Sequence, residues 1–545
     1  MNDQTSFAGL RRLGLLGSMA LVLCWAALLN GQPFFYPDTP TYLRGAEMGA
    51  TRLLGPAAPK PWLPAQGAAS APVAASPSAL AAASPVPHAS SAAQTAAPRK
   101  LKPLTSVADK VVLAGRSVYY GALLYAGYLA GGMWLTVAIQ ALCVAYVLQL
   151  LMVRLWGMGS AQAFGMAAGL AAFTPLGIYT GFLMPDVFAP LVILAAGALA
   201  VYWRELARGQ RWALAVILLF GLCAHSSHVA LALCLLALAL LARLLNKRWR
   251  SLSSAALLVL AACIGGAVAA EWAFGKAVTA AVGAPPLRLP HPMARLIDLG
   301  PGTAYLKQRC PGAGYAACDY VQNYPTTWDD FLFSTDPAKG AFALADADAK
   351  RRLSSEQLRF AFDVLRFDPA GVMGGVALDV LRQLGMFQVD IGGYDARILA
   401  MYEGRVPERI FLGMQRSRAG EPWALNRWLT LATYASVLAS LPALGVWWWR
   451  QRRASAALAA PTRLQQRRLE DFAAMLVAGV LANALVCAAL ASSMDRFQAR
   501  VVWLLPFMAF CAWLVVRRTA LSTPGALASS RPGTSSDLSI QGVTQ

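Results

Sequence analysis

Apolar stretches of about 20 residues recur along this chain, separated by short segments rich in arginine. Hydrophobic residues make up 57% of the 545 residues, and charged residues only 14%. A soluble protein of this size could not bury so much apolar surface, whereas a lipid bilayer accepts it directly. The pattern therefore predicts an all-α polytopic membrane protein.

A helix needs about 20 predominantly apolar residues to cross a bilayer. On that basis we expect about ten transmembrane helices. Their ranges are 11–29, 133–153, 160–183, 187–203, 212–224, 229–245, 253–275, 427–449, 472–491 and 501–516. The run 212–245 could also form one long tilted helix, and we divide it at His225-Ser226-Ser227-His228 because histidines are costly at mid-membrane.

The net charge of +20 comes from short segments between the apolar runs, because the long loop 276–426 is nearly neutral. Arginine and lysine concentrate in cytoplasmic loops of membrane proteins, which argues against nucleic acid as a partner. The basic residues on the predicted cytoplasmic side are Arg11, Arg12, Arg154, Arg204, Arg208, Arg211, Arg243, Lys247, Arg248, Arg250, Arg450, Arg452, Arg453, Arg463, Arg467, Arg468, Arg517 and Arg518. This distribution predicts that both termini are cytoplasmic.

The predicted organisation follows from these spans. It comprises a first transmembrane helix (1–30), which we expect to be an uncleaved anchor, an outer loop (31–132), transmembrane helices 2–7 (133–275), a large periplasmic loop (276–426), transmembrane helices 8–10 (427–516) and a cytoplasmic tail (517–545). Within the first outer loop, about 55–104 is rich in Ala, Pro and Ser and is predicted to be a disordered insertion. Tyrosines in 115–132 predict an interfacial helix, although 117–153 could instead be one kinked span.

The large loop 276–426 contains two runs with helical periodicity. The first has Ser354 or Ser355 as its expected N-cap and a stop near Pro369, and the second covers 372–387. We expect these surface helices to cap the outer mouth of the bundle. Cys310 and Cys318 are the only cysteines in a polar loop, and outside the cytoplasm they favour a disulfide.

Two aspartates at outer helix ends are the candidate catalytic residues. Asp38 lies among aromatic residues in Tyr36-Pro37-Asp38-Thr39, a sequence that is also a good turn. Asp186 follows Pro185 in a short connection between two spans, where it could serve simply as the N-cap of the next helix. Both residues are predicted to face the outer surface.

Histidines and arginines on the same predicted side are candidates for substrate binding. His225 and His228 are one helical turn apart and could bind a metal ion, a substrate or another helix. Arg496 and Arg500 are predicted on the outer side, where the positive-inside bias disfavours arginine. They could pair with Asp495, contact headgroups or hold a phosphate. Arg116 is a further candidate for phosphate.

No nucleotide-binding loop, dinucleotide fingerprint or Gly-x-Ser-x-Gly nucleophile is present in the sequence. A soluble nucleotide cofactor is therefore not expected. If the chain is an enzyme, its substrate is expected to be carried by the membrane.

Four elements together resemble the GT-C superfamily of membrane glycosyltransferases. They are the acidic motif Tyr36-Pro37-Asp38-Thr39 after the first span, the acid in Met184-Pro185-Asp186, the interfacial segment between them, and Asp495-Arg496-Phe497 before the last span. The resemblance implies a bacterial inner-membrane enzyme that uses a polyprenyl-phosphate-linked sugar at the periplasmic face. Many members carry paired acids in the first loop, whereas Thr39 follows Asp38 here, which weakens the case for a divalent metal.

By that resemblance, Asp38 deprotonates or orients an acceptor hydroxyl on a glycan, lipid or protein. Arg116, Arg496 and one of the two histidines would stabilise the leaving lipid phosphate. Asp186 would position the acceptor or the base, and Tyr36 and Arg500 would contact substrate.

Other functions also fit this sequence. A transporter or lipid flippase would distribute acids and histidines through the depth of the bundle. A glycan polymerase or ligase, or an acyl-group transferase acting on lipid-linked substrates, would also work at the outer leaflet.

Overall fold

The computed structural model describes residues 2–57, 59, 62, 109–389, 393–420, 423–454 and 460–521. It is all-α and 79% helical. The insertion expected to be disordered, about 55–104, lies outside the described residues except for 55–57, 59 and 62, and the tail beyond 521 also lies outside them.

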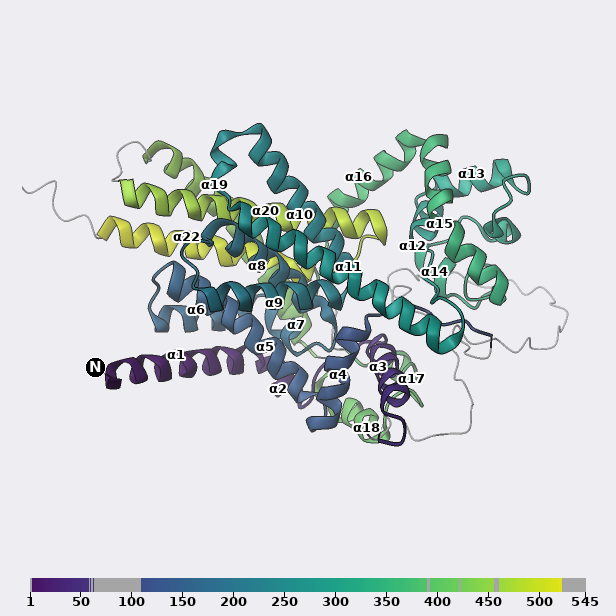
Figure 1. Cartoon of the computed structure of the whole chain (residues 1–545), viewed down its shortest axis with the longest axis horizontal. Helices are drawn as coiled ribbons and strands as arrows, with labels where there is room; N and C mark the ends of the chain where they lie inside the picture. Colours follow the sequence, from purple (N-terminus) through teal and green to yellow (C-terminus); the bar gives the residue numbers. More distant parts are fainter. Residues whose placement is uncertain are drawn as a thin grey trace, which may run out of the picture.

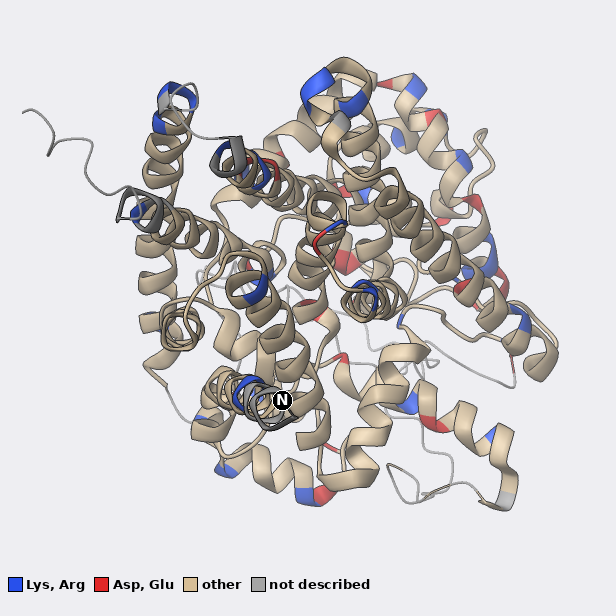
Figure 2. Cartoon of the chain, turned by 60° about the vertical axis from the view of Figure 1, so that its left-hand side comes forward, with Lys and Arg blue, Asp and Glu red and all other residues tan. Residues whose placement is uncertain are grey.

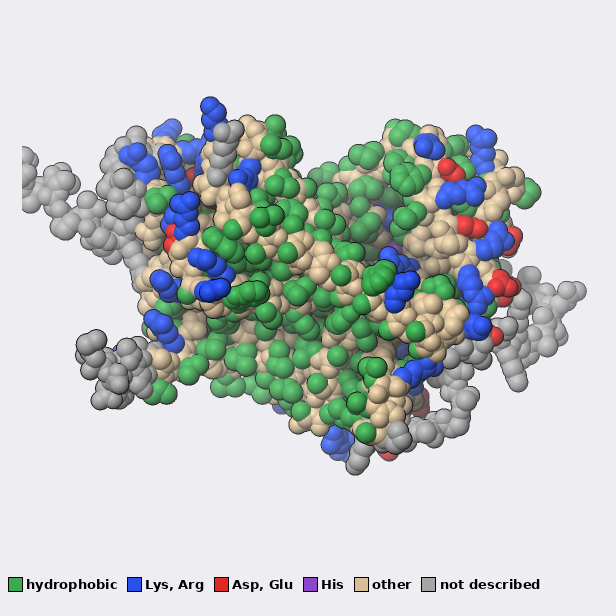
Figure 3. All heavy atoms as spheres, viewed as in Figure 1, with side chains coloured by type: hydrophobic (Ala, Val, Ile, Leu, Met, Phe, Trp, Pro, Cys, Tyr) green, Lys and Arg blue, Asp and Glu red, His purple; other side chains and the backbone are tan. Residues whose placement is uncertain are grey.

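Seven helices are long and apolar enough to cross a membrane, by length and composition. They coincide with α5 (Trp134–Gln149) and the turn after it, α8 (Phe188–Tyr202), α10 (Ser226–Leu245), α11 (Ser254–Val282), α19 (Leu425–Ala454), α20 (Ala460–Leu490), and α21 (Asp495–Val502) with α22 (Leu504–Leu521). On the face that Figure 3 shows, hydrophobic side chains cover most of this helical part. The prediction of a helical chain with several apolar spans is confirmed.

The other three predicted spans correspond to shorter or less apolar helices. They are α1 (Asn2–Leu23), α6 (Ser160–Phe173) and α9 (Arg208–Ala224). The continuous helix expected over 160–183 is wrong, because α6 stops before Thr174-Pro175 and α7 (Leu176–Gly181) follows separately. Proline pushes the preceding residue into an extended conformation, and Thr174 has φ −138° and ψ 168°.

Two other connections are settled by backbone conformation. The chain breaks at His225, between α9 and α10, as the division of 212–245 predicted. The alternative of one kinked span over 117–153 is wrong, because α4 (Val118–Gly131) ends in Gly132 at φ 64° and Met133 at φ 80° before α5 begins. A positive φ at two successive residues redirects the chain.

The beginning of α1 and the end of α22 lie at the same end of the helix bundle (Figure 1). Lysines and arginines recur at the helix ends on this side, which Figure 2 turns toward the reader. The segment from α12 (His291–Asp298) through α13 (Pro301–Arg309), α14 (Trp328–Phe333), α15 (Ala347–Phe367) and α16 (Pro369–Gly385) lies at the other end (Figure 1). We call this segment the outer domain, after the side of the membrane that the sequence predicts for it.

The outer domain has a hydrophobic core of its own, built from buried residues between Leu289 and Val372. Cys310 and Cys318 form a disulfide within it. The N-cap expected at Ser354 or Ser355 is wrong, since α15 begins at Ala347 and the Asp346 carboxylate accepts the capping hydrogen bond from the Ala349 amide at 2.8 Å. A short acidic side chain directly before the helix satisfies an amide that has no partner inside it.

Arg295 fastens the outer domain to the bundle. Its Nε donates to the carbonyl oxygen of Ala488 at the end of α20 at 2.9 Å. Its guanidinium also pairs with Asp298, at 3.1 Å, and with Asp379 of α16. Because Arg295 is only 3% exposed, these two carboxylates and one carbonyl satisfy a charge that burial would otherwise penalise.

Two shorter groups of helices complete the described chain. The first outer loop contributes α2 (Trp25–Asn30) and α3 (Thr39–Leu54), and α3 packs closely along α4. Beyond the outer domain, α17 (Ala396–Ala400) and α18 (Glu408–Arg416) precede α19. These pieces surround the loop that carries Asp38.

The contact between α3 and α4 depends on a glycine. A Cβ atom at Gly121 would lie 2.3 Å from the carbonyl oxygen of Tyr42. We expect Gly121→Ala to lower the free energy of unfolding by about 1–3 kcal/mol, because the two helix backbones must move apart. Thermal unfolding of the purified protein in detergent measures the change.

Gly131→Ala in the same helix is the matched control, since a Cβ there meets nothing within 4 Å. Alanine is a better helix former than glycine, so the control should unfold at the same or a higher temperature. Equal melting temperatures for the two variants would contradict the close packing of α3 on α4.

Candidate functional site

The loop that carries Asp38 is closed by a threonine. The Thr39 hydroxyl accepts a hydrogen bond from the Tyr36 amide at 3.0 Å and donates one to the Leu183 carbonyl at 3.1 Å. Asp38 occupies the N-cap position of α3, but its side chain makes no capping hydrogen bond. The turn therefore uses only the backbone of Asp38, and its carboxylate is available for contacts outside the turn.

The Asp38 carboxylate pairs with Arg116. The distance from Oδ2 to Nη2 is 2.6 Å, and both side chains are about one-fifth exposed. Arg116 is presented by the start of α4, where the Ser117 hydroxyl caps the helix by accepting from the amides of Tyr119 and Tyr120. Burial by itself would lower the pKa of Arg116, and the neighbouring Asp38 carboxylate more than offsets it, so the pKa is raised.

Asp186 is buried, with 1% of its surface exposed, and its carboxylate binds two arginines. Arg496 makes a bidentate contact, with Nε 3.2 Å from Oδ1 and Nη2 2.6 Å from Oδ2. Arg500 Nη1 lies 3.4 Å from Oδ1. The alternative in which Asp186 only caps the next helix is wrong, because Val187 occupies that position and the Asp186 carboxylate binds the arginines instead.

Arg496 is held by aromatic residues as well as by Asp186. Its guanidinium carbon lies 4.1 Å from the centre of the Tyr36 ring and 5.3 Å from that of Phe182. The Tyr179 hydroxyl donates to the backbone carbonyl of Arg496 at 2.9 Å. A cation over an aromatic face gains on the order of 1 kcal/mol, so Tyr36 adds to the fixation of this charge.

Arg496 and Arg500 do not pair with the nearby Asp495. Asp495 accepts from the Gln388 amide at 2.7 Å, and so ties the start of α21 to the chain after α16. Arg500 reaches Asn483 of α20, whose Oδ1 accepts from Nη2 at 2.9 Å. Asn483 therefore belongs to the cluster. No sequence feature indicated this, because Asn483 is an isolated polar residue in an apolar stretch of helix.

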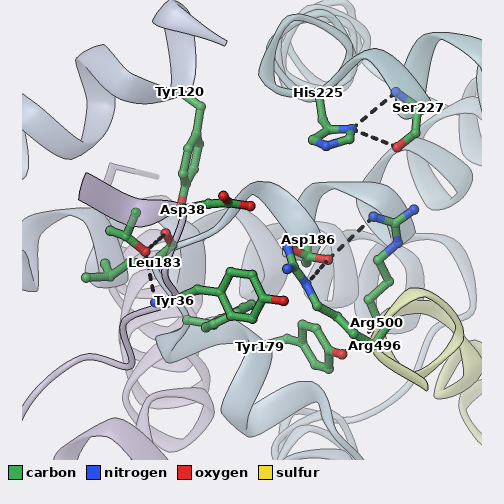
Figure 4. Close-up of polar contacts among 12 residues, drawn as sticks. Tyr36, Asp38, Tyr120, Tyr179, Leu183, Asp186, His225, Ser227, Arg496 and Arg500 are labelled. Atoms are coloured by element: carbon green, nitrogen blue, oxygen red, sulfur yellow. Dashed lines mark hydrogen bonds and ion pairs between the residues drawn. The ribbon is translucent and has the colours of Figure 1, made fainter. Parts of the chain in front are cut away.

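Backbone hydrogen bonds hold the two acidic segments side by side. The Phe34 amide donates to the Gly181 carbonyl at 3.0 Å, and the Phe34 carbonyl accepts from the Leu183 amide at 2.9 Å. Figure 4 shows Asp38, Asp186, Arg496, Arg500 and His225 facing one region. The structure thus gathers residues from four separate helix junctions that the sequence assigned to the same surface.

His225 and His228 adjoin this cluster, and some of their ring nitrogens form hydrogen bonds. His225 caps α10, with Nδ1 2.8 Å from the Ser227 hydroxyl, and its ring centre lies 5.4 Å from that of His228. His228 Nδ1 donates to the Gly221 carbonyl at 2.8 Å, while its buried Nε2 has no hydrogen-bond partner in the described structure. Within the described residues, no group of three or more His, Cys, Asp or Glu side chains is arranged to hold a metal ion.

Arg405, after α17, is a further cation that sequence reasoning missed. Its Nη2 donates to the Pro37 carbonyl at 3.3 Å, next to Asp38. The Tyr394 hydroxyl accepts from the Phe35 amide at 2.7 Å in the same loop. With Arg405 included, the two aspartates lie among four arginines, which leaves a net charge of +2.

The outer domain also contributes residues near Asp38 that the sequence analysis did not single out. His291 stacks on Trp328, with ring centres 5.4 Å apart, and Asp329 adjoins them in α14. Burial raises the pKa of Asp329 to about 7, with Asp330 and Asp38 adding to the effect. The adjacent acids Asp329-Asp330 after a tryptophan were the available signal in the sequence.

Comparison of the chain with protein-family models, curated proteins and solved structures finds no match.

Asp186→Asn should strongly destabilise the protein, because it leaves Arg496 and Arg500 buried beside a neutral side chain. Removing one partner of a buried ion pair costs about 3–5 kcal/mol. Thermal unfolding in detergent measures the loss. Asp348→Asn, which breaks an exposed pair with Arg351, is the control and should unfold as wild type; equal behaviour of the two variants would refute the structural role of Asp186.

The raised pKa of Asp329 predicts a pH dependence of stability. The folded protein holds this proton up to about pH 7, whereas the unfolded chain loses it near the usual pKa of 3.8, so stability falls as the pH rises between these values. Asp329→Asn removes the titration and should raise the melting temperature at pH 8 more than at pH 5. Asp330→Asn is the neighbouring control, and a gain for Asp329→Asn that does not change with pH would contradict the assignment.

Proposed function

We propose that this chain is a membrane glycosyltransferase that moves a sugar from a polyprenyl-phosphate donor to an acceptor hydroxyl at the outer face. The observation that carries the proposal is one cluster in which a partly exposed aspartate, Asp38, adjoins arginines that outnumber the carboxylates. A base next to fixed positive charge suits the transfer of a group away from a phosphate.

The proposed reaction uses Asp38 as the base. Its carboxylate takes the proton of the acceptor hydroxyl while the acceptor oxygen forms a bond to the anomeric carbon of the donor sugar. The bond from that carbon to the phosphate oxygen breaks, and its electron pair leaves with the polyprenyl phosphate. Arg116 holds Oδ2 of Asp38, and no hydrogen bond to Oδ1 occurs among the described residues, so Oδ1 is the oxygen available for the proton.

The arginines have different tasks in this proposal. Arg496 is fixed by Asp186 and Tyr36, so it offers a preorganised charge to the leaving phosphate at no cost of reorganisation. Arg116 and Arg405 border the Asp38 loop and add positive potential there. Asp186 then acts as a positioning residue, since both of its oxygens are already bound to guanidinium groups.

The proposed topology has ten crossings, with both termini in the cytoplasm of a bacterial cell. The seven apolar helices are joined in it by α1, α6 and α9. The positions of α1 and α22 at one end of the bundle and of the outer domain at the other support an even number of crossings (Figure 1). The clustered acids at helix junctions, rather than along the depth of the bundle, favour transfer over transport.

A deletion strain complemented with variants tests the proposal. Loss of the gene should cause a polyprenyl-phosphate sugar to accumulate, as measured by lipid mass spectrometry. Wild-type protein should reverse the accumulation, whereas Asp38→Asn should lower the rate by about 10²–10⁴-fold, the usual contribution of a general base.

Membrane levels of the variant must equal those of wild type, and Asp348→Asn on the exposed face of α15 should complement fully. Full complementation by Asp38→Asn would remove Asp38 as the base. Absence of any accumulated lipid-linked sugar in the deletion strain would overturn the proposed reaction itself.

A further inference from the structure

Three neighbouring polar atoms of the outer domain have no hydrogen-bond partner in the described structure. They are Nδ1 of His291, Nε1 of Trp328 and Oδ1 of Asp329, and each is shielded from solvent. His291 opens α12, and Trp328 and Asp329 open α14, which packs against α12. The three therefore come from one small region at the base of the outer domain.

Unpartnered polar atoms are costly to bury, because each loses its hydrogen bonds to water and gains none in return. Most buried polar groups in folded proteins are hydrogen-bonded, so three exceptions in one place require a reason. The Asp329 side chain is the strongest indication, because the residue is only 7% exposed and its Oδ1 has no hydrogen-bond partner within the described residues. Such a cluster fits a ligand that supplies the missing partners.

Contacts along the chain place this cluster beside the candidate site: the Ala114 amide donates to the Leu287 carbonyl at 2.8 Å, and a Cβ atom at Gly115 would lie 3.3 Å from the Leu289 side chain, so the segment before His291 lies against the one before Arg116. Asp38 contributes to the raised pKa of Asp329, and Arg116 and Asp38 both act on His291. Burial lowers the pKa of His291 to about 4, so its ring is neutral at physiological pH. The cluster is thus within electrostatic reach of the Asp38–Arg116 pair but carries no positive charge of its own.

The chemistry of the three groups matches hydroxyl groups. The Trp328 indole N–H only donates, a neutral histidine nitrogen donates or accepts, and a carboxyl group near its pKa does either. Hydroxyl groups can pair with each of the three, whereas a phosphate would meet a carboxyl group and no cation within the cluster. The stacked rings of His291 and Trp328, with planes 19° apart, also offer an apolar surface for the C–H groups of a sugar.

We propose that His291, Trp328 and Asp329 form a subsite that binds the hydroxyl groups of a sugar ring on the outer-domain side of Asp38. The assignment of this sugar to donor or acceptor rests on the proposed function, whereas the binding of a sugar does not. The subsite would make specificity for the sugar a property of the outer domain and leave the transfer itself to the residues at the helix junctions.

Saturation-transfer NMR on the full chain in lipid nanodiscs tests the subsite. The probes are the methyl glycosides of glucose, galactose, mannose, N-acetylglucosamine and arabinose. At least one should receive saturation from the wild-type protein, and Trp328→Phe or Asp329→Asn should weaken its binding on the order of tenfold, the effect of one lost hydrogen bond. Asp330→Asn is the matched control, and its binding should equal wild type.

Two results would overturn the subsite: no methyl glycoside receives saturation, or binding is the same in Trp328→Phe and Asp329→Asn as in wild type. Thermal unfolding checks that each variant is folded, and two different substitutions keep the test decisive if one of them unfolds. Asp38→Asn separates the two proposals, because it should lower the rate of transfer by about 10²–10⁴-fold and leave glycoside binding intact. If the protein binds a glycoside but shows no transfer activity, the proposed function is contradicted and the subsite is not.

Discussion

The buried contact of Asp186 with Arg496 and Arg500 is the interaction on which the rest of the site depends. It joins the turn before α8 to α21, at the start of the last span. Tyr36 lies over the same Arg496, and Thr39 reaches back to Leu183 near Asp186. Because charges taken out of water must be paired, the chain can bury two arginines here only if these segments meet.

The loop that carries Asp38 is held from two sides. The bundle fixes it through Phe34, which shares two backbone hydrogen bonds with the 181–183 segment. The segment after the outer domain fixes it through Tyr394 and Arg405. The long outer loop is therefore part of the site and not merely a cover over the mouth of the bundle. In the low-dielectric surroundings of this site, each charge acts more strongly than in water.

Much of the architecture could be predicted, because apolar length and basic flanks are local properties of the sequence. The acids and arginines at helix ends were also found, since a charge at a span boundary is conspicuous. The break at Pro175 and the N-cap of α15 at Asp346 were missed, although proline and a capping aspartate are local signals too. His291 and Arg405 were missed for another reason, because the residues they contact are far away in the chain.

The sequence by itself determined that this chain is helical and apolar, and that its few charged residues collect at helix ends. Only the tertiary structure decided which charges pair: Asp38 with Arg116, and Asp186 with Arg496 and Arg500 rather than with a helix terminus. The reason is physical. Hydrophobicity acts residue by residue and can be read along the chain, whereas a buried charge is satisfied only by a partner that folding brings within hydrogen-bonding distance.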